Sequence, residues 1–543
     1  MACLLLQLGS YCAQLQLTAA SSINTPRNIF FLLFAASNQK IKGCCKAANN
    51  KKKMFRGVLM LLAAVSCSWA QYEPNCNNKQ AIVQLFEWKW TDVAAECERF
   101  LAANGYCGVQ ISPPAEHIVL PELAWPWWQR YQPVSYQLNG RSGTEAQFID
   151  MVQRCNQVGV RIYGDAVINH MTGANQKGVG HAGSTFDTTG SVRDFPAVPY
   201  TAENFTPRQL CPSASGNVDN YDDRNNAYNC YLYGLVDLYH RSDYVRQTIA
   251  NYLNTMVDIG VAGFLIDTAK NVWPEDIAAI ESLLHDLPID QGFSSNARPY
   301  IFQTVVEFNE FDIKVGDYYD TGMVTEFRYP AKITYGINSY EQLRSLVDYS
   351  WGMSIPERAV VFVDNHDLQR DSNIGPGDVT TFKTPIEYKQ AVAYTLAQDY
   401  GFVRLMSSYY FEFADQAPPN DGTYNTLDVI INQDGSCANG WVCEHRWNII
   451  KRMIRFRNAV VGTPMENYWN NGVAVAFSRG NKGFFAMAKS GYLQINLQTG
   501  LPQGIYCNLI DDCNTSIQVL ADGTADISIA NPDDPAVAFI TFD

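Results

Sequence analysis

The sequence predicts an α/β protein, a (β/α)8 or TIM barrel with an inserted subdomain and a C-terminal antiparallel β-sandwich domain. Three observations predict it. Eight short apolar runs occur between residues 82 and 407, and helical patterns lie between most of them, as in a parallel barrel. A stretch rich in Gly, Asn and Asp, about residues 170–239, follows the third run and is long for an ordinary loop. Beyond about residue 471 the pattern changes to short alternating strands.

The predicted strands are short apolar runs, many of them bounded by turn residues. In the barrel they are Ile82–Phe86, Val109–Ser112, Arg161–Ile168, Val261–Asp267, Tyr300–Val306, Val324–Phe327, Val360–Asn365 and Phe402–Ser407. In the C-terminal domain they are Val473–Ser478, Phe484–Ala488, Leu493–Leu497, Tyr506–Ile510, Ile517–Leu520, Ala525–Ile529 and Ala536–Phe542. We assign 71–169 and 240–472 to the barrel, 170–239 to the inserted subdomain and 473–543 to the C-terminal domain.

Helical periods between the strands support the alternation. The segment Thr91–Ala103 places its apolar residues on one face and ends before Gly105. Ser242 is predicted to cap a helix that runs through Met256. The segment Thr384–Asp399 has a proline in its first turn, as a helix start prefers.

The N-terminal residues carry a targeting pattern. Residues 54–70 combine a basic start, a short apolar run and the small-residue ending Ser68-Trp-Ala70, which predicts a signal peptide cleaved after Ala70. A signal peptide begins at the initiator Met, so we interpret residues 1–53 as an upstream extension. A membrane anchor is the alternative, but the apolar run is too short to span a bilayer. We therefore expect a secreted, extracellular chain without a membrane segment.

Charge and cysteine content narrow the class of protein further. The formal net charge of −14 argues against a nucleic-acid partner, because the chain has no basic field for phosphates. Ten of the fifteen cysteines lie beyond residue 70, an even number that indicates disulfides in an exported chain. No CxxC pair occurs among these ten, so a zinc site is a poor interpretation, and spacing alone leaves their pairing open.

Three predicted strands end in residues that can do chemistry. These endings are Asp165-Ala-Val-Ile-Asn-His170, Gly263-Phe-Leu-Ile-Asp267 and Phe362-Val-Asp-Asn-His-Asp367. The C-terminal ends of barrel strands line the active site, so Asp267 is predicted to be catalytic there. The alternative, an Asp that only caps the next helix, weakens once all three endings are considered together.

With these motifs the sequence resembles the animal α-amylases of the α-amylase glycoside hydrolase family, over about residues 71–543. Further matching segments are Leu85-Phe-Glu-Trp, Trp127-Trp-Gln-Arg-Tyr-Gln-Pro-Val-Ser-Tyr136, Cys443-Glu-His-Arg-Trp447 and Leu497-Gln-Thr-Gly-Leu-Pro502. The resemblance implies retaining hydrolysis of α-1,4-glucosidic bonds in starch or glycogen. That reaction needs one carboxylate as nucleophile and a carboxylic acid that protonates the leaving oxygen.

The resemblance assigns roles to single residues. Asp267 resembles the nucleophile and Asp367 the carboxylate that stabilises the transition state. The implied substrate-binding residues are Trp127, Trp128, Tyr131, His170, Lys270 and His366. The general acid should follow Gln303 at the end of the fifth strand, where the family has Glu, but this chain has Thr304. Glu307 is three residues further on, which in a strand places it on the opposite face and makes it a poor replacement.

The resemblance also implies two ion sites. Side chains of Asn169 and Asp237, with backbone carbonyls of Tyr228 and Asn271, match the family's calcium ligands and offer the oxygen donors that Ca²⁺ prefers. In the family's chloride site, Asn365 and Arg404 remain. Leu265 stands where the family has a second Arg, so we expect the anion site to be degenerate and chloride binding to be weak or absent.

The family pattern implies four disulfides: Cys97–Cys155, Cys211–Cys230, Cys437–Cys443 and Cys507–Cys513. Cys76 and Cys107 remain, and both precede neighbouring barrel strands. We therefore predict that these two form a fifth disulfide. Asn204-Phe-Thr and Asn514-Thr-Ser are glycan acceptor sequons in an exported chain.

Three functions fit the sequence. In the first, a monomeric secreted α-amylase homologue binds α-1,4-glucans but hydrolyses them very slowly or not at all, because Thr304 replaces the acid. In the second, the protein is an active α-amylase that uses another acid or water. In the third, it is a structural or signalling protein that has lost glucan binding. The aromatic and histidine residues that remain argue against the third, and Thr304 argues against the second.

Overall fold

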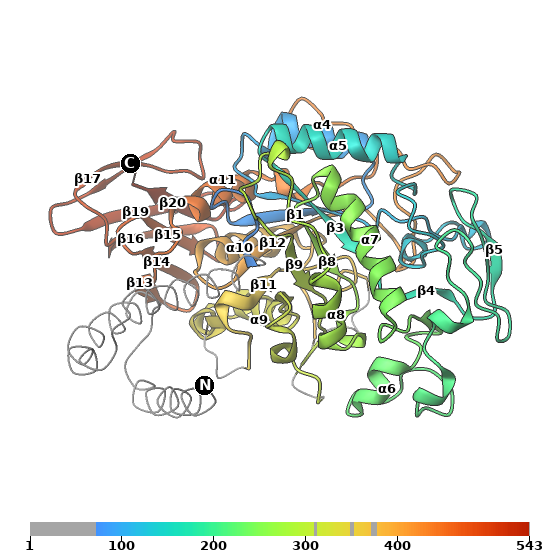
Figure 1. Ribbon diagram of the computed structural model, residues 1–543. Coiled ribbons are helices and arrows are strands. Elements are labelled where there is room, and N and C mark those ends of the chain that lie inside the picture. The colour runs from blue at the N-terminus through green and yellow to red at the C-terminus, as the bar shows by residue number, and fades with distance from the viewer. Residues whose placement is uncertain (1–71, 309–311, 348–351, 371–376, 542–543) are drawn as a thin grey trace, which may run out of the picture. The chain divides into compact units, whose positions relative to one another are not determined.

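A computed structural model describes residues 72–308, 312–347, 352–370 and 377–541 (Figure 1). The predicted upstream extension and signal peptide lie outside these residues. In the described part of the chain, no helix is long and apolar enough to cross a membrane.

Eight parallel strands close into a barrel, as predicted, in the order β1-β12-β11-β10-β9-β8-β3-β2 (Figure 1). They are β1 (Ala81–Leu85), β2 (Gly108–Ile111), β3 (Arg161–Ala166), β8 (Gly263–Ile266), β9 (Tyr300–Gln303), β10 (Met323–Thr325), β11 (Ala359–Val361) and β12 (Phe402–Ser407). Every residue of these strands is buried, which explains their apolar composition. A Cβ at Gly263 would lie 2.0 Å from the Tyr300 carbonyl oxygen, so the β8–β9 contact requires glycine there.

Helices follow most of the strands. They are α4 (Trp90–Glu96), α5 (Glu145–Gln157), α7 (Asp243–Ile259), α8 (Pro274–Glu281), α9 (Arg328–Asn338), α10 (Pro385–Ala397) and α11 (Asn448–Ala459). The helix predicted from Thr91 divides into α4 and a π-helical turn, η2 (Cys97–Leu101). Ser242 occupies the N-cap position of α7, but its side chain makes no capping hydrogen bond, so that detail of the prediction is wrong.

The long segment between β3 and α7 contains short elements. They are β4 (His170–Gly173), β5 (Lys177–Val179), β6 (Thr185–Asp187), α6 (Arg224–Asn229) and β7 (Leu235–Asp237). Strand β4 pairs with β7, and β5 pairs with β6. The sequence showed no helical period here, because the six residues of α6 are too few to display one.

Antiparallel strands form the C-terminal part. They are β13 (Met465–Asn470), β14 (Ala474–Arg479), β15 (Gly483–Ala488), β16 (Tyr492–Gln498), β17 (Gly504–Cys507), β18 (Ser516–Val519), β19 (Thr524–Ala530) and β20 (Ala536–Ile540). One sheet has the order β13-β14-β15-β20, and β16–β19 and β17–β18 form two pairs. Strand β13 was not predicted; it pairs with β14, so this sheet includes residues before Val473.

The part of the chain that the structure describes contains five disulfides. They join Cys76 to Cys107, Cys97 to Cys155, Cys211 to Cys230, Cys437 to Cys443, and Cys507 to Cys513. These are the pairs expected, including the fifth. The Cα atoms of Cys76 and Cys107 are 5.2 Å apart, inside the range that a disulfide requires.

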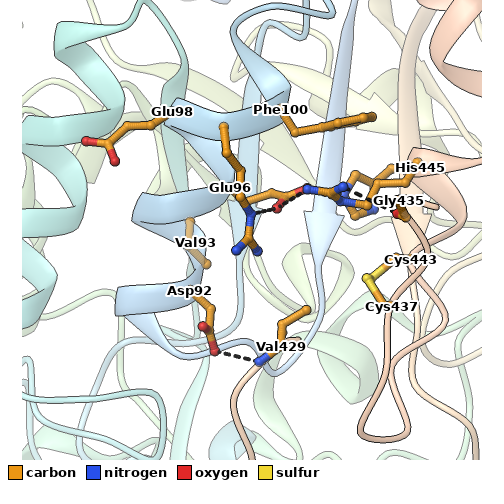
Figure 2. A network of polar contacts seen from close by, with 12 residues as sticks. Asp92, Val93, Glu96, Glu98, Phe100, Val429, Gly435, Cys437, Cys443 and His445 are labelled. Carbon is orange, nitrogen blue, oxygen red and sulfur yellow. Dashed lines mark hydrogen bonds and ion pairs between the residues drawn. A yellow bond between two sulfur atoms is a disulfide. The ribbon is translucent and has the colours of Figure 1, made fainter. Parts of the chain in front are cut away.

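A buried polar network ties the segment after β12 to α4 and η2 (Figure 2). The Glu96 carboxylate is fully buried and accepts hydrogen bonds from Arg446 Nε at 2.6 Å and Arg446 Nη2 at 2.8 Å. His445 Nε2 lies 3.0 Å from the same carboxylate, and Arg99 Nε donates at 2.6 Å. Burial acts to raise the pKa of Glu96, but the hydrogen bonds from His445 and Arg446 outweigh it and hold the pKa well below its usual range.

The two glycan sequons lie in different environments. Asn204 is buried, and its side-chain oxygen accepts a hydrogen bond from the Thr201 amide at 2.8 Å. An enzyme that attaches glycans to folded surfaces cannot reach it. Asn514 is exposed in the turn between β17 and β18, so of the two it is the sequon that remains accessible.

Candidate active site

A cavity of about 460 Å³ opens at the C-terminal ends of the barrel strands. Its lining contains every residue to which the sequence analysis gave a catalytic or substrate-binding role. These are Trp127, Trp128, Tyr131, His170, Asp267, Lys270, Thr304, His366 and Asp367. The lining combines aromatic and aliphatic side chains with a cluster of polar and charged ones, as small-molecule sites often do.

The end of β8 places Asp267 between the ends of the neighbouring strands β3 and β9. Its amide donates to the Ala166 carbonyl at the end of β3, at 3.1 Å, and the Thr304 amide donates to the Ile266 carbonyl at 3.0 Å. Thr268 follows with φ +47°, a left-handed conformation that a β-branched residue rarely adopts. The backbone thereby turns away from β8 directly after the carboxylate.

Three carboxylates crowd this end of the barrel. Burial, and then repulsion from Asp165 and Asp367, raises the pKa of Asp267 well above its ordinary value. Burial also raises the pKa of Asp165 to about 7, against the hydrogen bond that the Tyr131 hydroxyl donates at 2.9 Å. The nucleophile candidate is therefore fully ionised only at higher pH than an exposed Asp.

Aromatic rings and neutral histidines form one wall. The His366 ring stacks on Phe86 at 4.8 Å and on Tyr131 at 5.5 Å, and Trp127 meets it edge-on at 5.2 Å. Burial lowers the pKa of His170 and of His366 to about 4, so both rings are uncharged near neutral pH. Neutral imidazoles both donate and accept hydrogen bonds, which suits them to sugar hydroxyls.

Thr304 is the residue that the sequence comparison with the family pattern predicts at the position of the acid. It lines the cavity with Asp267 and Asp367, and among the described lining residues these two aspartates alone carry carboxylates. Glu307 does not line the cavity. It is 2% exposed, accepts a hydrogen bond from the Val315 amide at 3.3 Å and pairs with Arg328 at 3.6 Å.

Comparisons with known proteins identify the family of this chain. A family model described as "Alpha amylase, catalytic domain" matches residues 131–374. Pancreatic α-amylase 2a5 of Mus musculus is 46% identical over 509 residues, covering 88% of this chain and 98% of the relative. The α-amylase of Tribolium castaneum is also 46% identical, covering 89% and 98%. The chain belongs to the α-amylase family.

A solved structure supports the family assignment at the level of the fold. It is a mutant of α-amylase I from Eisenia fetida in complex with maltohexaose, 39% identical to this chain, with a TM-score of 0.81. The match covers 87% of this chain and 99% of that one. This α-amylase-family chain is therefore similar to its relatives across the barrel, the inserted segment and the C-terminal strands.

The positions expected to form an anion site in this α-amylase-family chain are buried. Leu265 lies on β8 between Asp165 and Phe302, where it fills space with an apolar side chain. Arg404 Nη1 donates to Gln110 at 3.3 Å, while Arg404 Nη2 is buried without a protein partner. Asn365 Nδ2 donates to Asp367 at 3.1 Å. One guanidinium group therefore remains to attract an anion.

The expected calcium ligands form two pairs of residues that lie close together, Asn169 with Asp237 and Asn271 with Tyr228. Asp237 and Asn169 are both buried, and the Leu238 amide donates to the Asn169 carbonyl at 3.0 Å. Asn169 Oδ1 is buried and accepts no hydrogen bond from the protein, so this oxygen is available to coordinate a cation. Asn271 Nδ2 donates to Ala227, the neighbour of Tyr228, at 3.0 Å.

This donor set fits calcium and not a transition metal. The described residues contain no cluster of three or more His, Cys, Asp or Glu side chains that could bind a metal. A single carboxylate with amide and carbonyl oxygens is a hard-oxygen set, which suits Ca²⁺.

Some residues at the site received no role from the sequence. Tyr221 and Tyr233 line the cavity from the inserted segment, and Lys270 Nζ lies 4.6 Å from the centre of the Tyr221 ring. Arg370 lies 5.7 Å from the ring centre of Trp127 and 4.2 Å from that of Phe411. A residue from the inserted segment or a loop carries no strand-end motif, so nothing in the sequence pattern separates it from surface polar residues.

Proposed function

We propose that this protein is a secreted α-amylase homologue that binds α-1,4-glucans in the cavity but hydrolyses them very slowly or not at all. The observation that carries the proposal is Thr304 at the acid position. A threonine hydroxyl cannot protonate a leaving alcohol near neutral pH. Among the described residues, Glu307 is the carboxyl group that follows Thr304 most closely in the sequence, and it pairs with Arg328 outside the cavity.

Glucan binding is supported by the residues that remain. Trp127 and Trp128 are held in place, because their indole nitrogens donate to the Ala414 carbonyl at 2.9 Å and to Asp415 at 3.1 Å. Rings that face a cleft provide flat apolar surfaces for the faces of glucose units. The Eisenia fetida relative was solved with maltohexaose, a linear α-glucan, in a Glu→Gln mutant.

In the proposed reaction, Asp267 attacks the anomeric carbon of the bound sugar while Asp367 stabilises the developing positive charge. His170, His366 and Lys270 hold hydroxyl groups around the reacting ring. The step lacks a proton for the departing oxygen, so the leaving group would depart as an alkoxide. Release of reducing ends from soluble starch, measured against an Asp267→Asn variant, tests the proposal. Hydrolysis at ordinary amylase rates would overturn it.

The nucleophile should still react where no proton is needed. With an α-glucosyl fluoride, we expect turnover or a trapped glycosyl-enzyme on Asp267, detected by intact-mass spectrometry. The rate should fall as pH decreases through the raised pKa of Asp267, because only the ionised carboxylate attacks. Asp267→Asn is the control and should show no adduct. An adduct on another residue would contradict the assignment.

Chloride should have little effect on this protein. Because Leu265 stands in place of one of the two arginines expected at the anion site, a halide titration should leave both residual activity and the melting temperature nearly unchanged. Leu265→Arg is the complementary variant and should gain chloride-dependent stabilisation. A clear rise in the melting temperature of the unmodified protein with chloride would contradict the prediction.

We also propose a structural calcium ion held by Asn169, Asp237 and the carbonyls of Tyr228 and Asn271. Removing an ion that binds only the folded state costs about 2–3 kcal/mol at a hundredfold excess over its Kd. We therefore expect a chelator to lower the melting temperature and added Ca²⁺ to restore it. Asp237→Asn should abolish most of this response. Secretion is supported by the five disulfides, which persist in oxidising compartments.

A further inference from the structure

Exposed aromatic side chains gather beside the cleft. Among the described residues, six tyrosine and phenylalanine side chains are strongly exposed, and three of them belong to this region. Tyr233 is 89% exposed and lines the cavity itself. Tyr410 and Phe413 are 59% and 60% exposed and lie on the segment that follows β12. Large exposed rings that no core position requires suggest a binding surface.

The segment that carries Tyr410 and Phe413 is bonded directly to the Trp platform. The Ala414 carbonyl accepts from Trp127, and the Asp415 carboxylate accepts from Trp128. The segment is also folded on itself, because the Glu412 amide donates to Gln416 Oε1 at 2.8 Å and the Gln416 amide donates to the Phe413 carbonyl at 3.2 Å. The segment that carries the two exposed rings is therefore held next to the cleft.

A buried ring, Phe382, supports one of the exposed rings, Tyr410. Phe382 meets Tyr410 edge-on at 5.6 Å and Phe411 at 5.8 Å. Arg370 lies against both Phe411 and Trp127, so one cation joins this aromatic group to the cleft wall. A supported ring loses little conformational entropy when it binds a ligand.

We propose that Tyr410 and Phe413 form an outer platform for an α-glucan chain, continuous with the cleft. The occupant follows from the chemistry: flat apolar rings for the faces of glucose units, with the exposed polar groups of Glu412 and Asp415 beside them for hydroxyls. The inference rests on the proposed glucan binding in the cleft and extends the binding surface beyond it, to the part of a longer chain that leaves the cleft. The platform therefore favours long chains over short ones.

Isothermal titration of the purified protein with maltotriose and maltoheptaose tests the platform. Compared with the unmodified protein, a Tyr410→Ala/Phe413→Ala variant should bind maltoheptaose about tenfold more weakly, with maltotriose changed by about twofold or less. Tyr410→Phe should retain maltoheptaose binding, because it keeps the ring. Tyr492→Ala, at a residue 63% exposed on β16, is the matched control and should change neither affinity.

Each outcome has one meaning. Unchanged maltoheptaose binding in the double variant overturns the platform and leaves the proposed function intact. An equal loss of both ligands also overturns it, because the rings would then act only through the shape of the cleft. If the unmodified protein binds neither ligand, glucan binding itself fails, and the platform fails with it.

Discussion

Replacing Thr304 with Glu should restore hydrolysis of starch to this protein. A positioned general acid contributes about 10²–10⁴ in rate, or roughly 3–5 kcal/mol of barrier. The backbone at Thr304 is fixed by its hydrogen bond to Ile266 and by the Lys270 amide, which donates to the Thr304 carbonyl at 3.3 Å. A Glu side chain would therefore start from an ordered position in the cavity, next to Asp267. Reducing-end release from soluble starch is the measurement.

Leu265 sets the expected size of that gain. It leaves Arg404 as the remaining guanidinium group of the expected anion site, and burial lowers the pKa of Arg404 to about 10. The family pattern has two arginines that hold a chloride ion near the acid, whereas this chain has only Arg404 of the two. We therefore expect no bound anion to adjust the pKa of a new Glu at position 304. We expect the lower part of the range for Thr304→Glu, and a further gain with chloride once Leu265→Arg is added.

Two controls make the result decisive. Thr304→Glu combined with Asp267→Asn should be inactive, because the acid cannot act without the nucleophile. Glu307→Gln should not lower residual activity, since Glu307 pairs with Arg328 outside the cavity. If Thr304→Glu binds glucan but hydrolyses starch no faster than the unmodified protein, position 304 is not where the general acid is missing.

The barrel could be predicted from sequence because its strands are short, buried and apolar. Such a run can be recognised without knowing which strands it pairs with. Strand ends were less predictable. The run Val261–Asp267 gave β8 only from Gly263 to Ile266, because ladder pairing and not composition decides where a strand stops. Strand β13 was missed since a register shift between Glu466 and Trp469 breaks its alternation.

The site was predictable where a motif ends a strand. Asp267 and Asp367 carried such motifs, and the structure places both in one cavity with Thr304. Asp165 also ends a strand, yet its interaction with Tyr131 depends on a loop that folds back from β2, and no local pattern encodes that contact. Tyr410 and Phe413 could not be predicted as binding residues, because an exposed aromatic residue in a loop is part of no hydrophobic periodicity in the sequence.

Replacing Glu96 with Gln should strongly destabilise the fold. The carboxylate is buried and serves Arg446, Arg99 and His445 at once, so its loss leaves a buried guanidinium group without its counterion (Figure 2). Breaking a buried ion pair by removing one partner costs about 3–5 kcal/mol. Urea unfolding followed by circular dichroism should show this loss near neutral pH.

The matched control for that variant lies two residues away. Glu98 pairs with Arg154 at 2.5 Å, but its side chain is 41% exposed, and exposed pairs contribute about 1 kcal/mol or less. Glu98→Gln should therefore change the free energy of unfolding only slightly. Equal effects of the two substitutions would show that burial of the Glu96 network does not govern its energy.

The pH dependence gives an independent check on Glu96. The folded-state pKa of Glu96 lies below the value in the unfolded chain, about 4.3. Its stabilisation is therefore fully present above that value and is lost as pH falls through the folded pKa. The difference in unfolding free energy between the unmodified protein and Glu96→Gln should be constant from neutral pH down to about 5 and should shrink in stronger acid. A difference that grows in acid would place the stabilisation in the protonated form, and the carboxylate could not then be what holds the segment after β12 to helix α4.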